Sequence, residues 1–208
     1  FCPSCNSPVY AEEGEAVIRC TNADCPAQLL RHLIHFTSRD AMDIEGLGPA
    51  VLEQLLDADL IHNIVDIYTI DYEKVAELER TGEKTVQNLK NAIEASKKND
   101  LSKFIFALGI RHIGAKAGKL LAEHFGNIDI LLQAQMHDFE AIDGFGSILA
   151  KSAYEFFSLE STHAMIEKFK ELGLNLKSLK EVNDARFQGF TFVLTGTLSK
   201  YGRREAQE

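Results

Sequence analysis

The segment IEGLG at residues 44–48 is the first of four related stretches that decide the fold of this 208-residue chain. Three later segments share its apolar first residue and its final glycine: LERTG at 78–82, IRHIG at 110–114 and IDGFG at 142–146. The four final glycines lie 34, 32 and 32 residues apart. A regular spacing of this size is typical of an internal structural repeat.

A helical pattern follows each final glycine, because small or apolar residues recur four and seven positions on and fall on one helix face. These residues are Leu52 and Leu55, Val86 and Leu89, Gly118 and Leu121, and Ala150 and Ala153. The chain is therefore predicted to repeat one unit four times: a helix, a tight glycine turn and a second helix. We expect the first unit to pair with the second and the third with the fourth.

A glycine turn that opens directly into a helix is suited to phosphate. Glycine permits positive φ and lets another backbone approach closely. The unpaired N–H groups and the positive end of the helix dipole then point to one place outside the protein, where a phosphate oxygen fits. Glycine also ends helices for structural reasons alone, but four copies in register favour phosphate binding. Such contacts read no base edges, so binding would follow backbone shape.

The charge of the chain is segregated along its length. The formal net charge of -9 at pH 7 is, as a total, unfavourable for a nucleic-acid partner. Residues 40–79 hold eleven acids and one base, whereas residues 80–120 hold nine bases and three acids. The basic stretch includes the second and third turns, which favours a polyanion there. The alternative is that both stretches are solvated helix faces.

Composition predicts a soluble globular protein. The chain is 45% hydrophobic and 25% charged, both ordinary values for this class. No apolar run approaches the roughly 18 residues of a membrane span. We therefore expect a cytoplasmic protein with no membrane partner.

All four cysteines lie near the start of the chain, as the pairs Cys2 and Cys5, and Cys20 and Cys25. Two short-spaced pairs joined by a loop can place four sulfurs at the corners of a tetrahedron, which is the geometry of a closed structural zinc site. Two disulfides of a secreted domain are the alternative, but the rest of the chain has no cysteine and no segment resembles a signal peptide. An iron–sulfur cluster is a further alternative, although the long central spacing is less typical of it.

Helices are also expected outside the repeats. PAQLLRHLIHF follows the cysteines and predicts a helix that starts at Pro26. His32 and His35 flank its apolar stripe and are predicted to pack or face solvent, because four cysteines already complete a metal shell. ESTHAMIEKFKELG predicts one more helix, ended by Gly173.

A four-cysteine finger followed by four glycine hairpins resembles the C-terminal half of the bacterial NAD-dependent DNA ligases. The tail FQGFTFVLTGTLSKYGRREAQE at 187–208 is similar to the start of the BRCT domain of those enzymes, with Thr195 and Gly196 at its Thr-Gly turn. The resemblance implies a mainly α fold with a zinc ribbon at 1–26, a tandem helix-hairpin-helix domain at 27–173, a polar linker at 174–186 and an incomplete BRCT start.

The resemblance further implies a function. In the family such a segment grips nicked double-stranded DNA across the minor groove during replication and repair, beside the remaining domains of the same chain. The family's adenylation motif is Lys-x-Asp-Gly, and the nearest match here has Ala141 in the lysine position. We therefore expect a fragment that is inactive alone, holds zinc, and uses NAD only through the adenylation domain of the parent enzyme. In a bacterium it would act in the cytoplasm at the nucleoid.

The hairpin pattern of the family is apolar, any residue, Gly, apolar, Gly, and two turns depart from it. Arg80 and Thr81 alter the second turn, and His112 replaces the first glycine of the third. These turns are either distorted or exchange glycine for a side chain that meets phosphate. For His112 the alternative is a solvent-facing turn residue that contacts no phosphate. The predicted DNA-binding residues are Arg80, Gly82, Lys84, Arg111, His112, Gly114, Lys116, Lys119, Gly144, Gly146, Ser147 and Lys151.

The first turn is crowded by Asp40, Asp43, Glu45 and Glu53, so we expect it to pack against the second hairpin rather than to bind phosphate. Two other functions stay open. One is another helix-hairpin-helix repair protein, either a nuclease subunit or a glycosylase, although a glycosylase would carry its cysteines after its hairpin. The other is a protein-interaction scaffold in which the glycine turns only pack helices.

Overall fold

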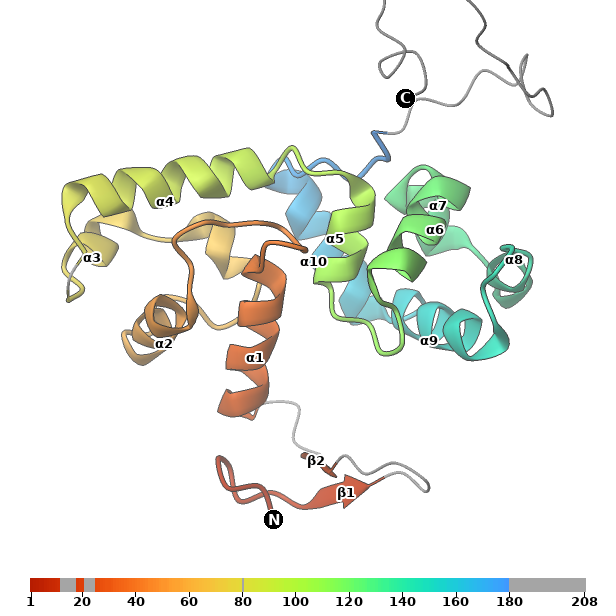
Figure 1. The fold of residues 1–208 in the computed structure, drawn as a ribbon, viewed down its shortest axis with the longest axis horizontal. Helices are drawn as coiled ribbons and strands as arrows, with labels where there is room; N and C mark the ends of the chain where they lie inside the picture. Colours follow the sequence, from red (N-terminus) through yellow and green to blue (C-terminus); the bar gives the residue numbers. More distant parts are fainter. Residues whose placement is uncertain (12–17, 21–24, 80, 180–208) are drawn as a thin grey trace, which may run out of the picture.

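The computed structural model describes residues 1–11, 18–20, 25–79 and 81–179, which form a small N-terminal ribbon and a larger helical body. Strands β1 (Val9–Ala11) and β2 (Ile18–Cys20) pair antiparallel in the ribbon. Helix α1 (Pro26–Thr37) leads from the ribbon into the helical body, so the ribbon lies at one end of the molecule (Figure 1). The prediction of a mainly α chain with a four-cysteine ribbon is confirmed.

Four pairs of helices flank the four glycine segments. The pairs are α1 with α2 (Pro49–Asp57), α3 (Tyr72–Ala76) with α4 (Glu83–Ser96), α5 (Leu101–Ala107) with α6 (Ala115–Phe125), and α8 (Met136–Glu140) with α9 (Ser147–Phe157). The other elements are the 3-10 helix η1 (Asp66–Thr69), α7 (Ile128–Gln133) and α10 (Glu160–Glu171). In the part of the chain that the structure describes, no helix is long and apolar enough to cross a membrane.

Local sequence sets several of the helix ends. Pro49, like Pro26, occupies the first position of its helix, where the missing N–H of proline has no intrahelical partner to lose. The side chains of Asp100 and Asn127 accept backbone N–H groups at the starts of α5 and α7. Gly173, at a φ of 81°, follows the end of α10, as its sequence position predicts.

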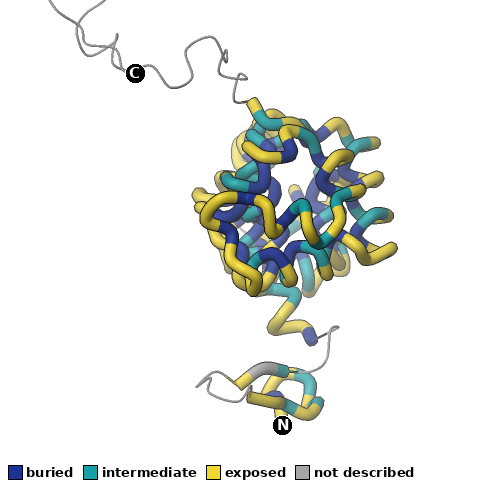
Figure 2. The backbone as a smooth tube through the Cα atoms, turned by 90° about the vertical axis from the view of Figure 1, so that its right-hand side faces the viewer, coloured by how far each residue is buried: buried dark blue, intermediate teal, exposed yellow. Residues whose placement is uncertain are grey.

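One hydrophobic core runs through the whole helical body and excludes the ribbon. Figure 2 shows buried residues throughout the helical body. At the centre, the ring of Phe169 on α10 lies 6.0 Å from that of Phe36, 5.8 Å from that of Tyr68 and 5.2 Å from that of Phe104. Phe36 belongs to α1, Tyr68 to η1 and Phe104 to α5, so α10 joins the first two hairpins to the last two.

Residues 174–179 pack on this body. Leu174 and Leu176 are buried. The backbone N–H of Asn175 donates to the carbonyl of Lys97 at 2.7 Å, and the N–H of Ile128 donates to the carbonyl of Leu176 at 3.0 Å. The polar linker predicted from residue 174 therefore does not begin there, because two leucines and the backbone between them bind the start of α7 and the end of α4.

The remainder of the predicted linker and the predicted BRCT start at 187–208 lie outside the described residues.

Candidate metal centre and nucleic-acid interface

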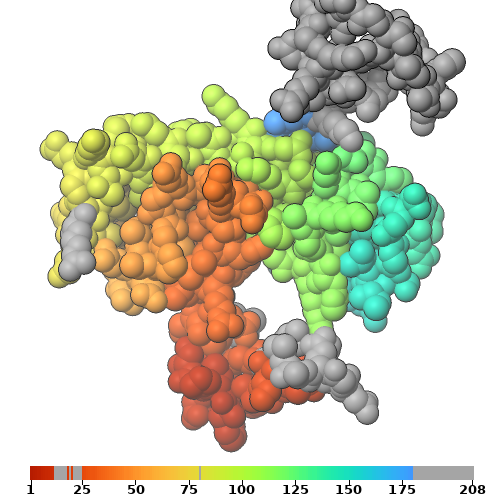
Figure 3. Space-filling view, viewed as in Figure 1, coloured from red at the N-terminus to blue at the C-terminus, as the bar shows by residue number. Residues whose placement is uncertain are grey.

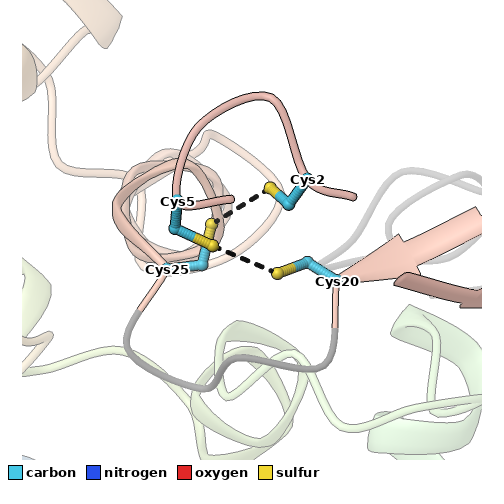
Figure 4. Close-up of side chains that lie close together, drawn as sticks. All are labelled: Cys2, Cys5, Cys20 and Cys25. Atoms are coloured by element: carbon cyan, nitrogen blue, oxygen red, sulfur yellow. Dashed lines mark hydrogen bonds between the residues drawn. The ribbon is translucent and has the colours of Figure 1, made fainter. Parts of the chain in front are cut away.

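The four cysteine side chains converge on one point at the end of the ribbon (Figure 4). Their sulfur atoms all lie within 4.8 Å of one another, with Cys2 Sγ 3.8 Å from Cys25 Sγ and Cys5 Sγ 3.4 Å from Cys20 Sγ. Four sulfurs at about 2.3 Å from one zinc ion would be separated by about 3.8 Å. None of the four cysteines is joined to another in a disulfide. The cluster therefore fits a closed tetrahedral zinc site, and the disulfide alternative is not supported.

Local backbone favours the thiolate form that a metal requires. Backbone N–H groups of Cys5 and Ser4 hold the pKa of the Cys2 thiol below its usual value. Cys25 is the N-cap residue of α1, so the positive end of that helix lies against the sulfur cluster. Because α1 continues into the core through Leu33 and Phe36, the metal centre is attached to the helical body by a single rigid helix.

The two histidines of α1 hold that helix in place rather than bind metal. Nε2 of His32 donates to the carbonyl of Leu108 at 3.2 Å, and Nε2 of His35 donates to the carbonyl of Phe106 at 2.8 Å. Partial burial lowers the pKa of the half-buried His32, which disfavours the charged form of its ring. Of the two predicted alternatives, packing or facing solvent, both half-buried histidines pack, and their contacts fix α1 against the end of α5.

The four glycine segments share one backbone turn. In each, the N–H of the fourth residue donates to the carbonyl of the first, at distances of 3.0 to 3.2 Å. The third residue has positive φ where it is described: 96° at Gly46, 64° at His112 and 74° at Gly144. These features define a turn that requires a left-handed third residue. The conformational need for glycine thus falls on the third position, whereas the final glycines have negative φ.

His112 adopts the left-handed conformation without being glycine. The third turn is therefore not distorted by this substitution, and the hydrogen bond from Ile113 to Ile110 is kept at 3.0 Å. A residue with a Cβ in this region costs about 1–2 kcal/mol of backbone strain. The cost is lower for Asn, Asp and His, which occur there more often than other residues with a Cβ. The strain is retained at an exposed position, where the side chain contributes nothing to the core.

Replacing His112 with glycine is expected to stabilise the chain by about 0.5–1 kcal/mol, because relief of strain outweighs the added freedom of the unfolded chain. Urea unfolding of the zinc-loaded chain measures the change. His137→Gly is the matched control, since His137 is exposed in helix α8 and the same substitution there should destabilise by about 0.5–1 kcal/mol. Destabilisation by both variants would show that the third turn is unstrained.

Each helix that follows a turn has the final glycine of that turn as its N-cap residue. Gly48, Gly82, Gly114 and Gly146 are the N-cap residues of α2, α4, α6 and α9, and none of these helices has a side-chain cap. Of the helices that follow no glycine turn, α3, α5 and α7 are capped by the side chains of Asp71, Asp100 and Asn127, whereas α1 and α10 have no side-chain cap. The hairpin helices therefore present their first N–H groups outward without a side-chain partner.

Space is left open at these helix starts. A Cβ added at any of the four final glycines would meet nothing within 4 Å, and their φ values are ones that other residues adopt. The fold itself therefore does not demand glycine there. Glycine instead leaves room for another molecule to approach the backbone.

The third and fourth hairpins meet at a depression of about 370 Å³. Arg111 and His112 of the third turn line it together with Lys151 of α9, so the structure brings together three of the predicted DNA-binding residues. The two regions lie side by side in Figure 3, where the third hairpin is green and α9 is cyan. An equivalent depression lies between Glu45 and Gly46 of the first turn and α4. The two depressions support the predicted pairing of hairpins.

Charge differs strongly between the two depressions. The first turn presents Glu45 at the position where the third turn presents Arg111. Gly46 of the first turn also lies close to α4, because a Cβ added at Gly46 would be 3.9 Å from the side chain of Leu89. The first turn therefore lies against helix α4 of the second hairpin.

Exposed lysines surround the helix starts of the last three hairpins. Lys84 and Lys116 follow their final glycines by two residues, and Lys119 and Lys151 follow theirs by five. Lys119 Nζ lies 3.9 Å from Glu123 and Lys151 Nζ 3.7 Å from Glu155, and both lysines remain mostly exposed. Arg80, the remaining predicted basic residue of the second turn, lies outside the described residues.

Three regions of the chain match known domain families. Residues 1–27 match the NAD-dependent DNA ligase C4 zinc finger domain. Residues 38–95, which include the first two turns, match the SAM-like helix-hairpin-helix tandem. Residues 103–166, which include the last two, match the helix-hairpin-helix motif. The C4 family match assigns zinc to the four cysteines, in agreement with their geometry.

Several relatives match along the whole chain, each with the name DNA ligase. The protein of Thermoanaerobacter pseudethanolicus is 50% identical over 206 residues, which is 99% of this chain and 31% of the relative. That of Acetivibrio thermocellus is 48% identical, over 100% of this chain and 32% of the relative. The protein of Clostridioides difficile is 45% identical over 100% of this chain. The chain spans about a third of their length. The chain is thus similar along its whole length to part of these DNA ligases, and its first 27 residues match the C4 zinc finger domain of the NAD-dependent DNA ligases.

Proposed function

We propose that this chain binds double-stranded DNA around nicks without reading sequence, as the non-catalytic C-terminal part of an NAD-dependent DNA ligase in replication and repair. The observation that carries the proposal is the set of glycine-capped helices whose first N–H groups face outward with open space before them. Backbone N–H groups at a helix start bind phosphate without contacting base edges. The relatives' name, DNA ligase, agrees with a DNA substrate.

The proposed binding surface comprises the second, third and fourth hairpins. Backbone N–H groups after Gly82, Gly114 and Gly146 would donate hydrogen bonds to one phosphate at each turn, and Gly144 and Ser147 would shape the fourth site. The adjacent basic side chains, Arg80, Lys84, Arg111, His112, Lys116, Lys119 and Lys151, would neutralise the phosphates of the duplex. The first hairpin would support the second without binding DNA, because its acids repel phosphate.

The division of labour within the parent enzyme is also a proposal. Residues 1–26 would form the zinc finger and residues 27–173 the DNA-binding domain. NAD would be used by an adenylation domain elsewhere in the ligase, in the bacterial cytoplasm at the nucleoid. Incubation of this chain alone with NAD and nicked DNA should then give neither an AMP adduct nor sealing, since the sequence contains no Lys-x-Asp-Gly motif to supply the adenylated lysine.

Replacing Lys116 with alanine is expected to weaken DNA binding equally on two unrelated nicked duplexes, because the lost contact is to phosphate. The slope of log affinity against log salt should fall in magnitude by about 0.9. Fluorescence anisotropy of labelled duplex over a range of salt concentrations measures both quantities. Glu45→Ala is the control, since removing an acid from the first turn should leave affinity unchanged or slightly higher.

The opposite pattern would contradict the hairpin assignment. If Glu45→Ala abolished binding in a folded protein and Lys116→Ala had no effect, the basic stretch would be a solvated helix face. Absence of binding by the unaltered chain at low salt would instead favour the interaction scaffold.

A further inference from the structure

The residue two positions after the final glycine differs among the four hairpins. It is Ala50, Lys84, Lys116 and Ile148 in chain order, and all four are exposed at the second position of a hairpin helix. Two hairpins therefore carry a lysine at this tip. The fourth carries an isoleucine that is 66% exposed.

The core gives no reason for an isoleucine at this position. The buried face of α9 consists of Ala150, Ala153 and Phe157, and Ile148 is not part of it. Among the described residues, the large exposed apolar side chains are few, and Ile148 is the one at a hairpin tip. Single exposed apolar residues are common on proteins, so its location at the equivalent of two lysines is the informative feature.

The surroundings of Ile148 combine apolar and basic groups. It lines the depression between the third turn and α9, where Ile110 and Phe156 supply apolar surface and Arg111, His112 and Lys151 supply donors and positive charge; Ser152 and Glu155 complete the lining. A ligand that fits must offer anionic groups and an apolar face beside them.

We infer that Ile148 packs against the apolar C–H edge of a deoxyribose next to a phosphate held at the start of α9. The inference rests on the proposed DNA binding. A protein that reads no base edges meets two surfaces on a duplex, the anionic phosphates and the sugar rings between them. In the second and third hairpins the tip lysine adds a charge contact, whereas in the fourth Lys151 and Arg111 supply charge and the tip contacts sugar.

The two kinds of contact respond differently to salt. A lysine that meets phosphate releases counterions, so its loss lowers the magnitude of the salt-dependence slope by about 0.9. An isoleucine that meets a sugar buries apolar area without counterion release, so its loss weakens binding equally at every salt concentration.

The test compares Ile148→Ser with Ile130→Ser in the full chain, using nicked duplexes of two unrelated sequences. Ile130 lies on α7, which belongs to no hairpin, and is 55% exposed, so it controls for loss of an exposed isoleucine. We expect Ile148→Ser to weaken binding about tenfold on both duplexes with an unchanged salt slope, as loss of most of one apolar contact predicts. Ile130→Ser should bind as the unaltered chain does.

Three outcomes would overturn the inference. The first is an unaltered affinity of Ile148→Ser for DNA. The second is a reduced salt slope of Ile148→Ser, which would mean that phosphate contacts were lost instead. The third is an equal loss of affinity in Ile130→Ser. Thermal unfolding checks that each variant is folded. If Ile148→Ser does not fold, Ile148→Thr, which keeps the β-branch, replaces it. Failure of the unaltered chain to bind DNA would reject the proposed function itself, which is a separate result.

Discussion

Removal of zinc is expected to unfold residues 1–26 and to leave the helical body folded. In the described part of the ribbon, two strands of three residues each and the buried Cys2 and Cys25 provide almost no hydrophobic core. Metal binding therefore supplies the folding free energy of this segment, about 10–16 kcal/mol at pH 7 for structural zinc in small fingers. Helix α1 should persist beyond its first turns, because Leu33 and Phe36 are anchored in the body.

Hydrogen exchange followed by mass spectrometry, before and after chelation, measures this separation segment by segment. Metal analysis should find one zinc per chain, and Cys5→Ser should lose it. The histidines of α1 provide the control: His32→Ala and His35→Ala should keep full zinc content, since both rings bond to carbonyls of α5 and its end. Iron in the purified protein, or two disulfides in fresh preparations, would contradict the zinc site.

The repeat and the metal site were predictable because both depend on local spacing. The periodic residues after each glycine, such as Leu52, Leu121 and Ala153, are buried as predicted, since helix geometry alone places them on one face. The cysteine pairs converge for a similar reason, because a tetrahedral site needs two short-spaced pairs joined by a loop.

Other features depend on residues far apart in the chain. His32 and His35 meet carbonyls 76 and 71 residues away, and no local pattern indicates these partners. The same holds for Leu174 and Leu176, which lie in a polar stretch typical of a linker and yet pack on the helical body. Tertiary packing here overrides the local signal.

The position of the strained residue was also beyond the sequence pattern. Two glycines in a five-residue segment do not reveal which one needs positive φ, and His112 in the third turn obscured it further. The hydrogen bond from the fourth residue to the first, present in all four segments, assigns that need to the third position. The final glycine is then free to serve the approach of another molecule.

Replacing Phe169 with alanine is expected to destabilise the helical body by about 3–5 kcal/mol, the usual cost of deleting a fully buried aromatic ring. Phe169 is completely buried and contacts the rings of Phe36, Tyr68 and Phe104. Urea unfolding of the zinc-loaded chain measures the change as a shift of the midpoint at constant slope. Phe156→Ala is the matched control, because that ring on α9 is only partly buried and should cost less than half as much.

The form of the transition also tests how the two hairpin pairs are coupled. Because the rings around Phe169 come from α1, η1 and α5, the loss should destabilise both pairs together and keep one cooperative transition. A loss below about 1 kcal/mol, or two separate transitions within the helical body of the unaltered chain, would mean that the pairs fold independently. A shared core matters for the proposed interface, since phosphates along a duplex are fixed in space and only hairpins held rigidly to one another can contact several at once.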